Sequence, residues 1–150
     1  MDVEQLLEGL QEGRRAQVSR AITLVESTAP RHRAGARDLL TRLAETAPQR
    51  PLAVRVGISG VPGVGKSTST NALVGELRRR DLRVAVLAVD PSSPFSGGAL
   101  LGDRIRMSEH TADRDVFIRS MAARGHLGGL SWATPQAMRV LDGAGFDVVL

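Results

Sequence analysis

Lys66 and Ser67 are the residues whose chemistry the sequence defines most sharply, because of the glycines that precede them. The run Gly60-Val61-Pro62-Gly63-Val64-Gly65-Lys66-Ser67 has the G-x-x-x-x-G-K-[ST] spacing of a phosphate-binding loop. In such a loop the glycines let the backbone approach phosphate oxygens, the lysine reaches the β- and γ-phosphates, and the serine hydroxyl binds Mg²⁺. The sequence therefore predicts a nucleoside-triphosphate site. Its expected binding residues are Gly60, Val61, Pro62, Gly63, Val64, Gly65, Lys66, Ser67 and Thr68.

The segments on either side of the loop are those that such a site requires. Leu52 to Ser59 is an apolar, β-branched run that predicts a buried strand, and Thr68 to Arg80 places Leu73 and Leu77 on one face of a helix. A helix that starts at a glycine loop directs several backbone N–H groups, and the positive end of its dipole, at one spot. The alternative, a fortuitous glycine turn with a surface lysine, does not account for this order of strand, loop and helix.

Asp90 is the first carboxylate that we expect to serve the metal and the reaction. Val84 to Asp90 predicts a second buried strand, and a strand, a helix and a strand in so short a stretch form a parallel βαβ unit. Asp90 then lies at the carboxyl end of its strand, the edge where open α/β sheets bind ligands. In the alternative interpretation, Asp90 only caps the turn Asp90-Pro91-Ser92-Ser93.

Asp103 is the second candidate carboxylate. It lies in Pro91 to Met107, a stretch rich in Pro, Ser and Gly, which predicts a switch segment beside the γ-phosphate. Arg104 and Arg106 either balance phosphate charge or are simply solvated. The predicted catalytic residues are Lys66, Asp90 and Asp103, and the predicted metal ligands are Ser67, Asp90 and Asp103.

The rest of the chain predicts two further strands and a second glycine loop. Val116 to Ser120 predicts a strand, and Gly125 to Leu130 a loop, in which His126 is either a general base or, as we favour, a structural residue. Ser131 to Asp142 predicts a helix, and Phe146 to Leu150 begins a strand in which the chain stops. We therefore expect these residues to be the N-terminal portion of a longer protein, with the C-terminal part of the nucleotide-binding domain missing.

Residues 1–50 predict a helical extension of three helices, separated at Gly13 and at Ala29-Pro30. Three apolar stripes at helical spacing support this prediction: Leu6, Leu7 and Leu10; Val18, Ile22 and Val25; Ala36, Leu39, Leu40 and Leu43. The extension is either a docking surface for a partner protein or, as we favour, a helical cap on the nucleotide-binding domain. The predicted architecture is α/β, with the extension at 1–50 and an incomplete P-loop domain with a mostly parallel sheet at 51–150.

Composition argues against several other classes of protein. With no Cys there is no disulfide framework, thiolate zinc site or cysteine nucleophile, so a cytoplasmic protein is expected. No apolar run approaches the ~20 residues of a membrane span, and no membrane partner is expected. A net charge of +4 with only 3% aromatic residues offers little surface for stacking bases, so no nucleic-acid partner is expected.

Several blocks beyond the loop resemble the MeaB/ArgK/MMAA family of P-loop GTPases. The most specific are Asp90-Pro91-Ser92-Ser93 and Leu101-Gly102-Asp103-Arg104-Ile105-Arg106-Met107, because the loop alone indicates only a P-loop NTPase. The resemblance covers nearly the whole chain, including Ala21 to Ser27 in the helical extension. It departs at Ser131 to Gln136, where the family usually has a more basic start to the helix.

This resemblance implies a SIMIBI-class GTPase that binds Mg²⁺ and GTP or GDP. It also implies a chaperone that gates adenosylcobalamin loading and protection of methylmalonyl-CoA mutase, as a homodimer when full length. Gly63, Gly65, Lys66, Ser67 and Thr68 would hold phosphates and metal, with Asp90 and Asp103 as switch carboxylates.

The family's Glu-Thr-Val-Gly segment, its guanine-reading Asn-Lys-x-Asp and its dimerisation arm would follow Leu150, so the fragment alone is expected to be inactive. Two alternatives remain open, an ATPase or kinase linked to basic amino-acid transport and a metal-insertion GTPase. The absence of Cys and the presence of only 3 His offer few ligands for the latter.

Overall fold

The computed structural model describes residues 2–46, 51–61, 63–90, 110–122 and 132–150. They form two compact units, one of Met1–Ala53 with Ala133–Phe146, the other of Val54–Trp132 with Asp147–Leu150. The domain boundary predicted at residue 50 stays a prediction. The helix at 134–143, which the sequence suggested would belong to the nucleotide-binding part, is grouped with the N-terminal helices.

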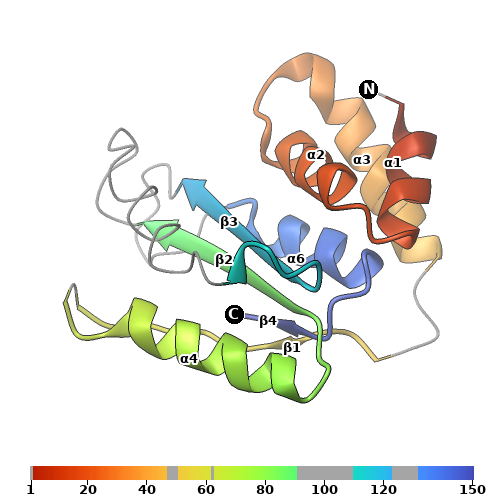
Figure 1. The fold of residues 1–150 in the computed structure, drawn as a ribbon. Helices are drawn as coiled ribbons and strands as arrows, with labels where there is room; N and C mark the ends of the chain where they lie inside the picture. Colours follow the sequence, from red (N-terminus) through yellow and green to blue (C-terminus); the bar gives the residue numbers. More distant parts are fainter. Residues whose placement is uncertain (1, 47–50, 62, 91–109, 123–131) are drawn as a thin grey trace. The chain divides into compact units, whose positions relative to one another are not determined.

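The first unit consists of helices, as expected for residues 1–50. They are α1 (Val3–Gln11), α2 (Arg15–Glu26), α3 (Pro30–Glu45) and α6 (Thr134–Gly143) (Figure 1). Local signals fix their ends: the Asp2 carboxylate accepts the backbone N–H of Glu4 at the start of α1, Gly13 follows α1 with φ 67°, and Pro30 opens α3. The prediction of three N-terminal helices is confirmed.

The core of this unit is built from the predicted stripes together with α6. Its buried members include Leu6, Leu10, Val18, Ile22, Val25, Leu39 and Leu43, joined from α6 by Ala137, Val140 and Leu141. Leu7, Ala36 and Leu40 are only half-buried because they lie at the margins of their stripes. A buried polar contact also joins Ala53 to α6, because the Ala53 N–H donates to Asp142 Oδ1 at 3.0 Å.

Two glycines inside helices of this unit give opposite expectations for substitution by alanine. A Cβ on Gly9 would lie 2.1 Å from Gln17 Cγ and 2.7 Å from Gln17 Cβ, so Gly9→Ala must push α1 and α2 apart. We expect Gly9→Ala to lower the free energy of unfolding by about 1–3 kcal/mol. A Cβ on Gly35 would meet nothing closer than 3.8 Å, so Gly35→Ala should raise it by about 0.5–1 kcal/mol. Urea denaturation measures both, and equal stability of the two variants would contradict the close contact at Gly9.

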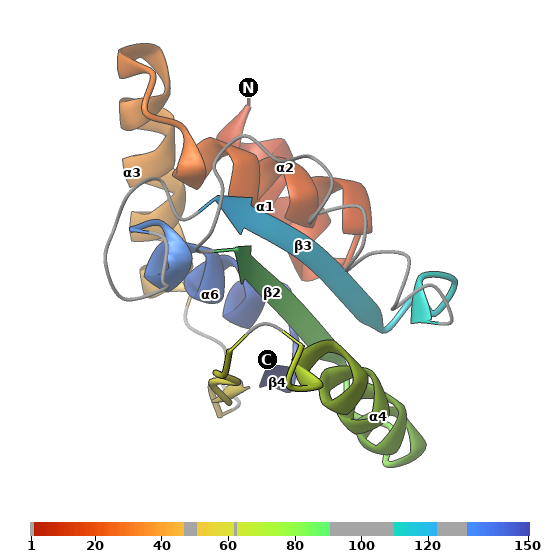
Figure 2. The same cartoon turned by 90° about the vertical axis from the view of Figure 1, so that its left-hand side faces the viewer.

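The second unit contains a parallel sheet of four strands in the order β1-β4-β2-β3. The strands are β1 (Val54–Arg55), β2 (Val84–Asp90), β3 (Val116–Ala122) and β4 (Val148–Val149). Figure 2 shows β2 and β3 side by side and pointing the same way, with Val84 opposite Val116 and Asp90 opposite Ala122. The predicted α/β class and parallel sheet are confirmed.

The expectation of a buried strand from Leu52 to Ser59 is wrong in both length and burial. β1 has only two residues, and the alternating side chains of Leu52, Val54, Val56 and Ile58 are 59%, 62%, 39% and 38% exposed. β1 is at the edge of the sheet beside β4, which it contacts through Val54 N–H to Asp147 O and Val56 N–H to Val149 O. Residues 54–59 are exposed on both faces of the strand, so no described element covers either face. Sequence pattern does not distinguish such an edge strand from a central one.

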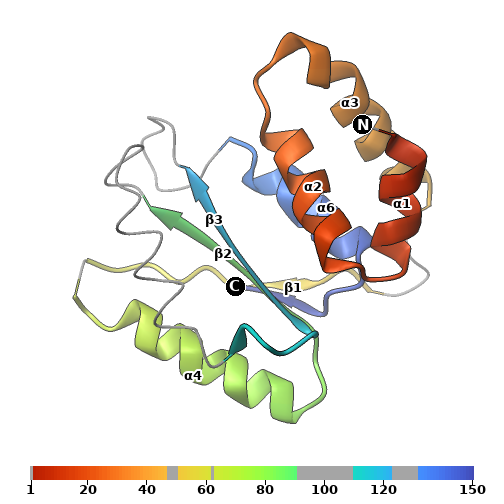
Figure 3. The same cartoon turned by 45° about the horizontal axis from the view of Figure 1, so that its top comes forward.

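α4 (Lys66–Arg79) lies along one face of the sheet (Figure 3). The apolar cluster of this face contains Val74 of α4 and Val84, Val86 and Val116 of the strands, with Leu77, Ile118 and Leu150 packed against it. Because β2 and β3 are parallel and in register, their residues of even number share this face. The helix N-terminus and the carboxyl ends of the strands therefore belong to the same unit of the structure.

None of the helices in the described part of the chain combines the length and the apolar character that crossing a bilayer requires.

Candidate nucleotide-binding site

The N-terminus of α4 is formed by residues whose backbone conformation and side chains suit the binding of an anion. Two glycines of the loop adopt positive φ, Gly63 at 81° and Gly65, the N-cap of α4, at 99°. Among the described residues no side chain caps the helix, and its first turn contains no acidic residue. The first N–H groups of a helix have no partner within the helix, so here they can bind an anion, with the helix dipole favouring negative charge.

Lys66 is the first residue of α4, two residues earlier than the helix start predicted from the sequence. Its Nζ donates to the carbonyl of Gly60 in an exposed hydrogen bond, which holds the ammonium against the loop. A Cβ at Gly60 would lie 2.8 Å from Val64 Cγ1, a methyl group of an exposed side chain that would have to move aside. Lys66 therefore contacts the backbone of its own loop, and its role toward a phosphate stays a prediction.

Ser67 provides the hydroxyl that fits a Mg²⁺ ion. It follows Lys66 in the first turn of α4 and is half-buried. Within the described residues there is no cluster of three or more His, Cys, Asp or Glu side chains that could hold a metal ion. Mg²⁺ is commonly bound through few protein ligands plus phosphate oxygens and waters, and the Ser or Thr hydroxyl of a phosphate loop is one such ligand, so Ser67 fits that role.

The other predicted site residues are placed only in part. Asp90 is the last residue of β2, at the carboxyl end of the strand as predicted, although its side chain lies outside what the structure describes. Pro62, Asp103, Arg104, Arg106 and His126 also lie outside the described residues, and their roles stay predictions.

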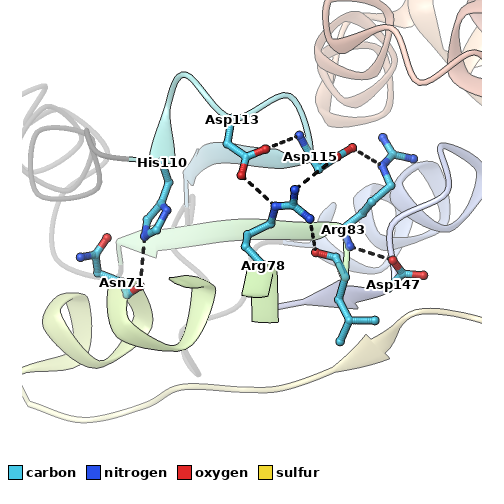
Figure 4. A network of polar contacts seen from close by, with 8 residues as sticks. Asn71, Arg78, Arg83, His110, Asp113, Asp115 and Asp147 are labelled. Atoms are coloured by element: carbon cyan, nitrogen blue, oxygen red, sulfur yellow. Dashed lines mark hydrogen bonds and ion pairs between the residues drawn. The ribbon is translucent and has the colours of Figure 1, made fainter. Parts of the chain in front are cut away.

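A polar network at the opposite end of α4 was not predicted from the sequence (Figure 4). Arg78, in the last turn, donates from Nε to Asp113 Oδ2 at 2.8 Å, from Nη2 to Asp115 Oδ2 at 3.3 Å, and from Nη1 to the Leu82 carbonyl at 3.1 Å. Asp115 also accepts from Arg83 Nε at 3.1 Å. The network ties the end of α4 to the starts of β2 and β3, and the Arg83 N–H extends it to the Asp147 carboxylate before β4 at 2.7 Å.

Charge and hydrogen bonding make Arg78 and Asp113 a strong pair within this network. The Arg78 hydrogen bond, followed by the backbone N–H of Asp115, lowers the pKa of Asp113 below its ordinary value. The same hydrogen bond raises the pKa of Arg78. The side chains are 20% and 32% exposed, so the pair is better shielded than the Arg79–Glu76 pair on the same turn, at 77% and 48%. No regular spacing of motif residues would have revealed this pair, because Arg78 and Asp113 lie far apart in the sequence.

Comparison with known proteins identifies relatives along nearly the entire chain. Residues 18–150 match the family described as methylmalonyl Co-A mutase-associated GTPase MeaB. A protein of Mycobacterium tuberculosis named a probable GTPase is 50% identical over 148 residues, covering 99% of this chain and 43% of its own length. The mouse methylmalonic aciduria type A homolog, a mitochondrial protein, is 43% identical over 155 residues, covering 99% of this chain and 37% of its own length.

A solved structure has the same fold. The crystal structure of a LAO/AO transport system kinase superposes with a TM-score of 0.70 and 34% identity, covering 98% of this chain and 41% of the other. The chain thus spans less than half the length of each of these relatives. Because the family match extends over most of the chain, the chain belongs to the MeaB family of methylmalonyl-CoA mutase-associated GTPases.

Proposed function

We propose that this chain is the phosphate- and metal-binding part of a GTPase that acts as a chaperone for an adenosylcobalamin-dependent methylmalonyl-CoA mutase. The observation that carries the nucleotide part is the loop at Gly60 to Ser67, whose lysine and positive-φ glycines lie at a helix N-terminus that no side chain among the described residues caps. The family match supports GTP as the nucleotide and the mutase as the partner.

Each residue of the loop has a distinct task in this proposal. The N–H groups at the start of α4 and the Lys66 ammonium bind the phosphate oxygens, and Lys66 exchanges its contact with the Gly60 carbonyl for a phosphate oxygen. Ser67, Asp90 and Asp103 would hold the metal. Bound Mg²⁺ supplies charge neutralisation of the β- and γ-phosphates. Lys66, Asp90 and Asp103 then stabilise charge and position the attacking water.

Nucleotide choice is the first test of this proposal. In the full-length protein, competition against a bound fluorescent guanine nucleotide should show that GTP displaces it at a much lower concentration than ATP. The physical reason is that a base-reading loop forms hydrogen bonds to one base and leaves polar groups unpaired with the other. A clear preference for ATP would refute the GTPase assignment and leave the loop as a general triphosphate site.

A second candidate function is an ATPase or kinase associated with basic amino-acid transport. The observation in its favour is the structural relative, which is named a LAO/AO transport system kinase. The two candidates differ in nucleotide and in partner, so the same competition separates them. Transfer of phosphate to a protein acceptor, detected with γ-labelled nucleotide, would favour the kinase.

The chaperone part of the proposal needs its own measurement. Full-length protein immobilised with a GTP analogue or with GDP should retain purified methylmalonyl-CoA mutase, to different extents in the two nucleotide states. Failure to retain the mutase in every nucleotide state would refute the partner while leaving the GTPase proposal standing.

A further inference from the structure

Residues 110–115, which we call the 110–115 strap, contact α4 at two points. At the first, the His110 ring lies with Nε2 at 3.1 Å from the backbone carbonyl oxygen of Asn71. A carbonyl oxygen only accepts, so Nε2 carries the hydrogen and donates it. At the second, Asp113 and Asp115 accept from the Arg78 guanidinium at 2.8 and 3.3 Å. Both contacts are visible in Figure 4.

The two contact points lie on one stripe of the helix. Asn71 and Arg78 are seven residues apart, which is nearly two full turns and roughly 10 Å along the axis. A helix held at two points on one stripe cannot rotate about its axis or slide along it without breaking both contacts. Ser67 lies four residues before Asn71, on the same stripe and one turn closer to the phosphate loop.

The apolar contacts of α4 with the sheet are made mainly by Val74, which is buried, and by Leu77, which is partly buried against the same cluster. Apolar contacts are non-directional, so a small rotation that keeps Val74 covered costs little. Hydrogen bonds weaken steeply when their angle changes, so the strap resists that same rotation.

We propose that the 110–115 strap sets the rotation of α4 and so orients the Ser67 hydroxyl toward the metal, with His110 and Asp113 as positioning residues. This inference rests on the proposed binding of Mg²⁺ and GTP. Neither residue belongs to the phosphate loop. We therefore expect their substitution to change the part of the nucleotide affinity that depends on Mg²⁺, and to leave unchanged the part that the phosphate contacts of the loop provide. The backbone N–H groups at the helix N-terminus are directed along the axis and tolerate rotation better than a side chain that points outward.

The test is the affinity of a non-hydrolysable GTP analogue for the full-length protein, measured with Mg²⁺ and with EDTA. In His110→Ala, we expect the gain in affinity that Mg²⁺ provides to fall by about 3- to 10-fold, as one lost hydrogen bond implies, with the affinity in EDTA unchanged. His110→Gln places an amide N–H near the position of Nε2 and should restore most of the gain. Asp113→Asn, which keeps the shape of the side chain, should give a smaller loss in the same direction.

Arg79→Ala is the matched control, because its partner Glu76 is also on α4 and the pair does not reach the strap. It should leave the gain from Mg²⁺ unchanged. All measurements are made at a temperature where circular dichroism shows each variant folded. An unchanged gain in both His110→Ala and Asp113→Asn, or equal losses with and without Mg²⁺, would overturn the inference alone. Absence of GTP binding by the wild-type protein would overturn it together with the proposed function.

Discussion

Lys66→Ala should abolish measurable GTP binding by the full-length protein while leaving the fold intact. The ammonium is a charge-assisted donor to phosphate oxygens, and losing such a contact costs about 1.5–3 kcal/mol or more, which weakens binding by at least about 10- to 100-fold. The fold should not change, because Lys66 packs within the loop and contributes nothing to the apolar cluster of Val74, Val84, Val86 and Val116. Titration with a fluorescent GTP analogue measures the first effect and thermal unfolding the second.

The informative control for this experiment is Lys66→Arg. It keeps the positive charge but replaces the compact ammonium by a planar guanidinium, which the loop must accommodate next to the Gly60 carbonyl. Weak binding by Lys66→Arg would show that shape as well as charge is required. An unchanged affinity for the GTP analogue in Lys66→Ala would exclude a role for Lys66 in nucleotide binding.

Ile22→Ala should destabilise the helical unit by about 2–5 kcal/mol. Ile22 is fully buried in α2, where it packs among the cores of the neighbouring helices, and its deletion leaves a cavity that the surrounding helices fill only in part. Urea denaturation followed by far-ultraviolet circular dichroism measures the loss.

The next residue provides a control within the same helix. Thr23 is exposed, and its hydroxyl donates to the Ser19 carbonyl at 3.0 Å, so Thr23→Ala should change stability by less than about 0.5 kcal/mol. Similar losses of stability in Ile22→Ala and Thr23→Ala would contradict the burial of Ile22 in the core of this unit.

Several helices and strands were predictable because their signals are local. Apolar spacing identified the three N-terminal helices, the glycine–lysine motif located the start of α4 to within two residues, and a run of β-branched residues identified β2. These signals depend on backbone conformation and on burial of a single face, both of which are written in neighbouring residues. The motif predicted the chemistry of Lys66 and Ser67 for the same reason.

What the sequence did not predict depends on contacts between distant segments. The exposure of Leu52, Val54 and Val56 depends on which elements cover the faces of β1, and neither that covering nor the sheet order has a local signal. The pairing of Arg78 with Asp113 and the grouping of α6 with the N-terminal helices are likewise tertiary. A charged residue at the end of a helix is usually solvated, so sequence reasoning had no ground for selecting Arg78.

The contact between Lys66 and the Gly60 carbonyl has a practical use. Lys66 is the only lysine of these 150 residues, so an amine-reactive reagent has one side-chain target here besides the chain's α-amino group. The reagent must compete with the carbonyl in the empty loop and with a phosphate in the occupied one. The chain therefore carries its own chemical reporter of occupancy, readable by mass spectrometry of the peptide around Lys66 without introducing a label.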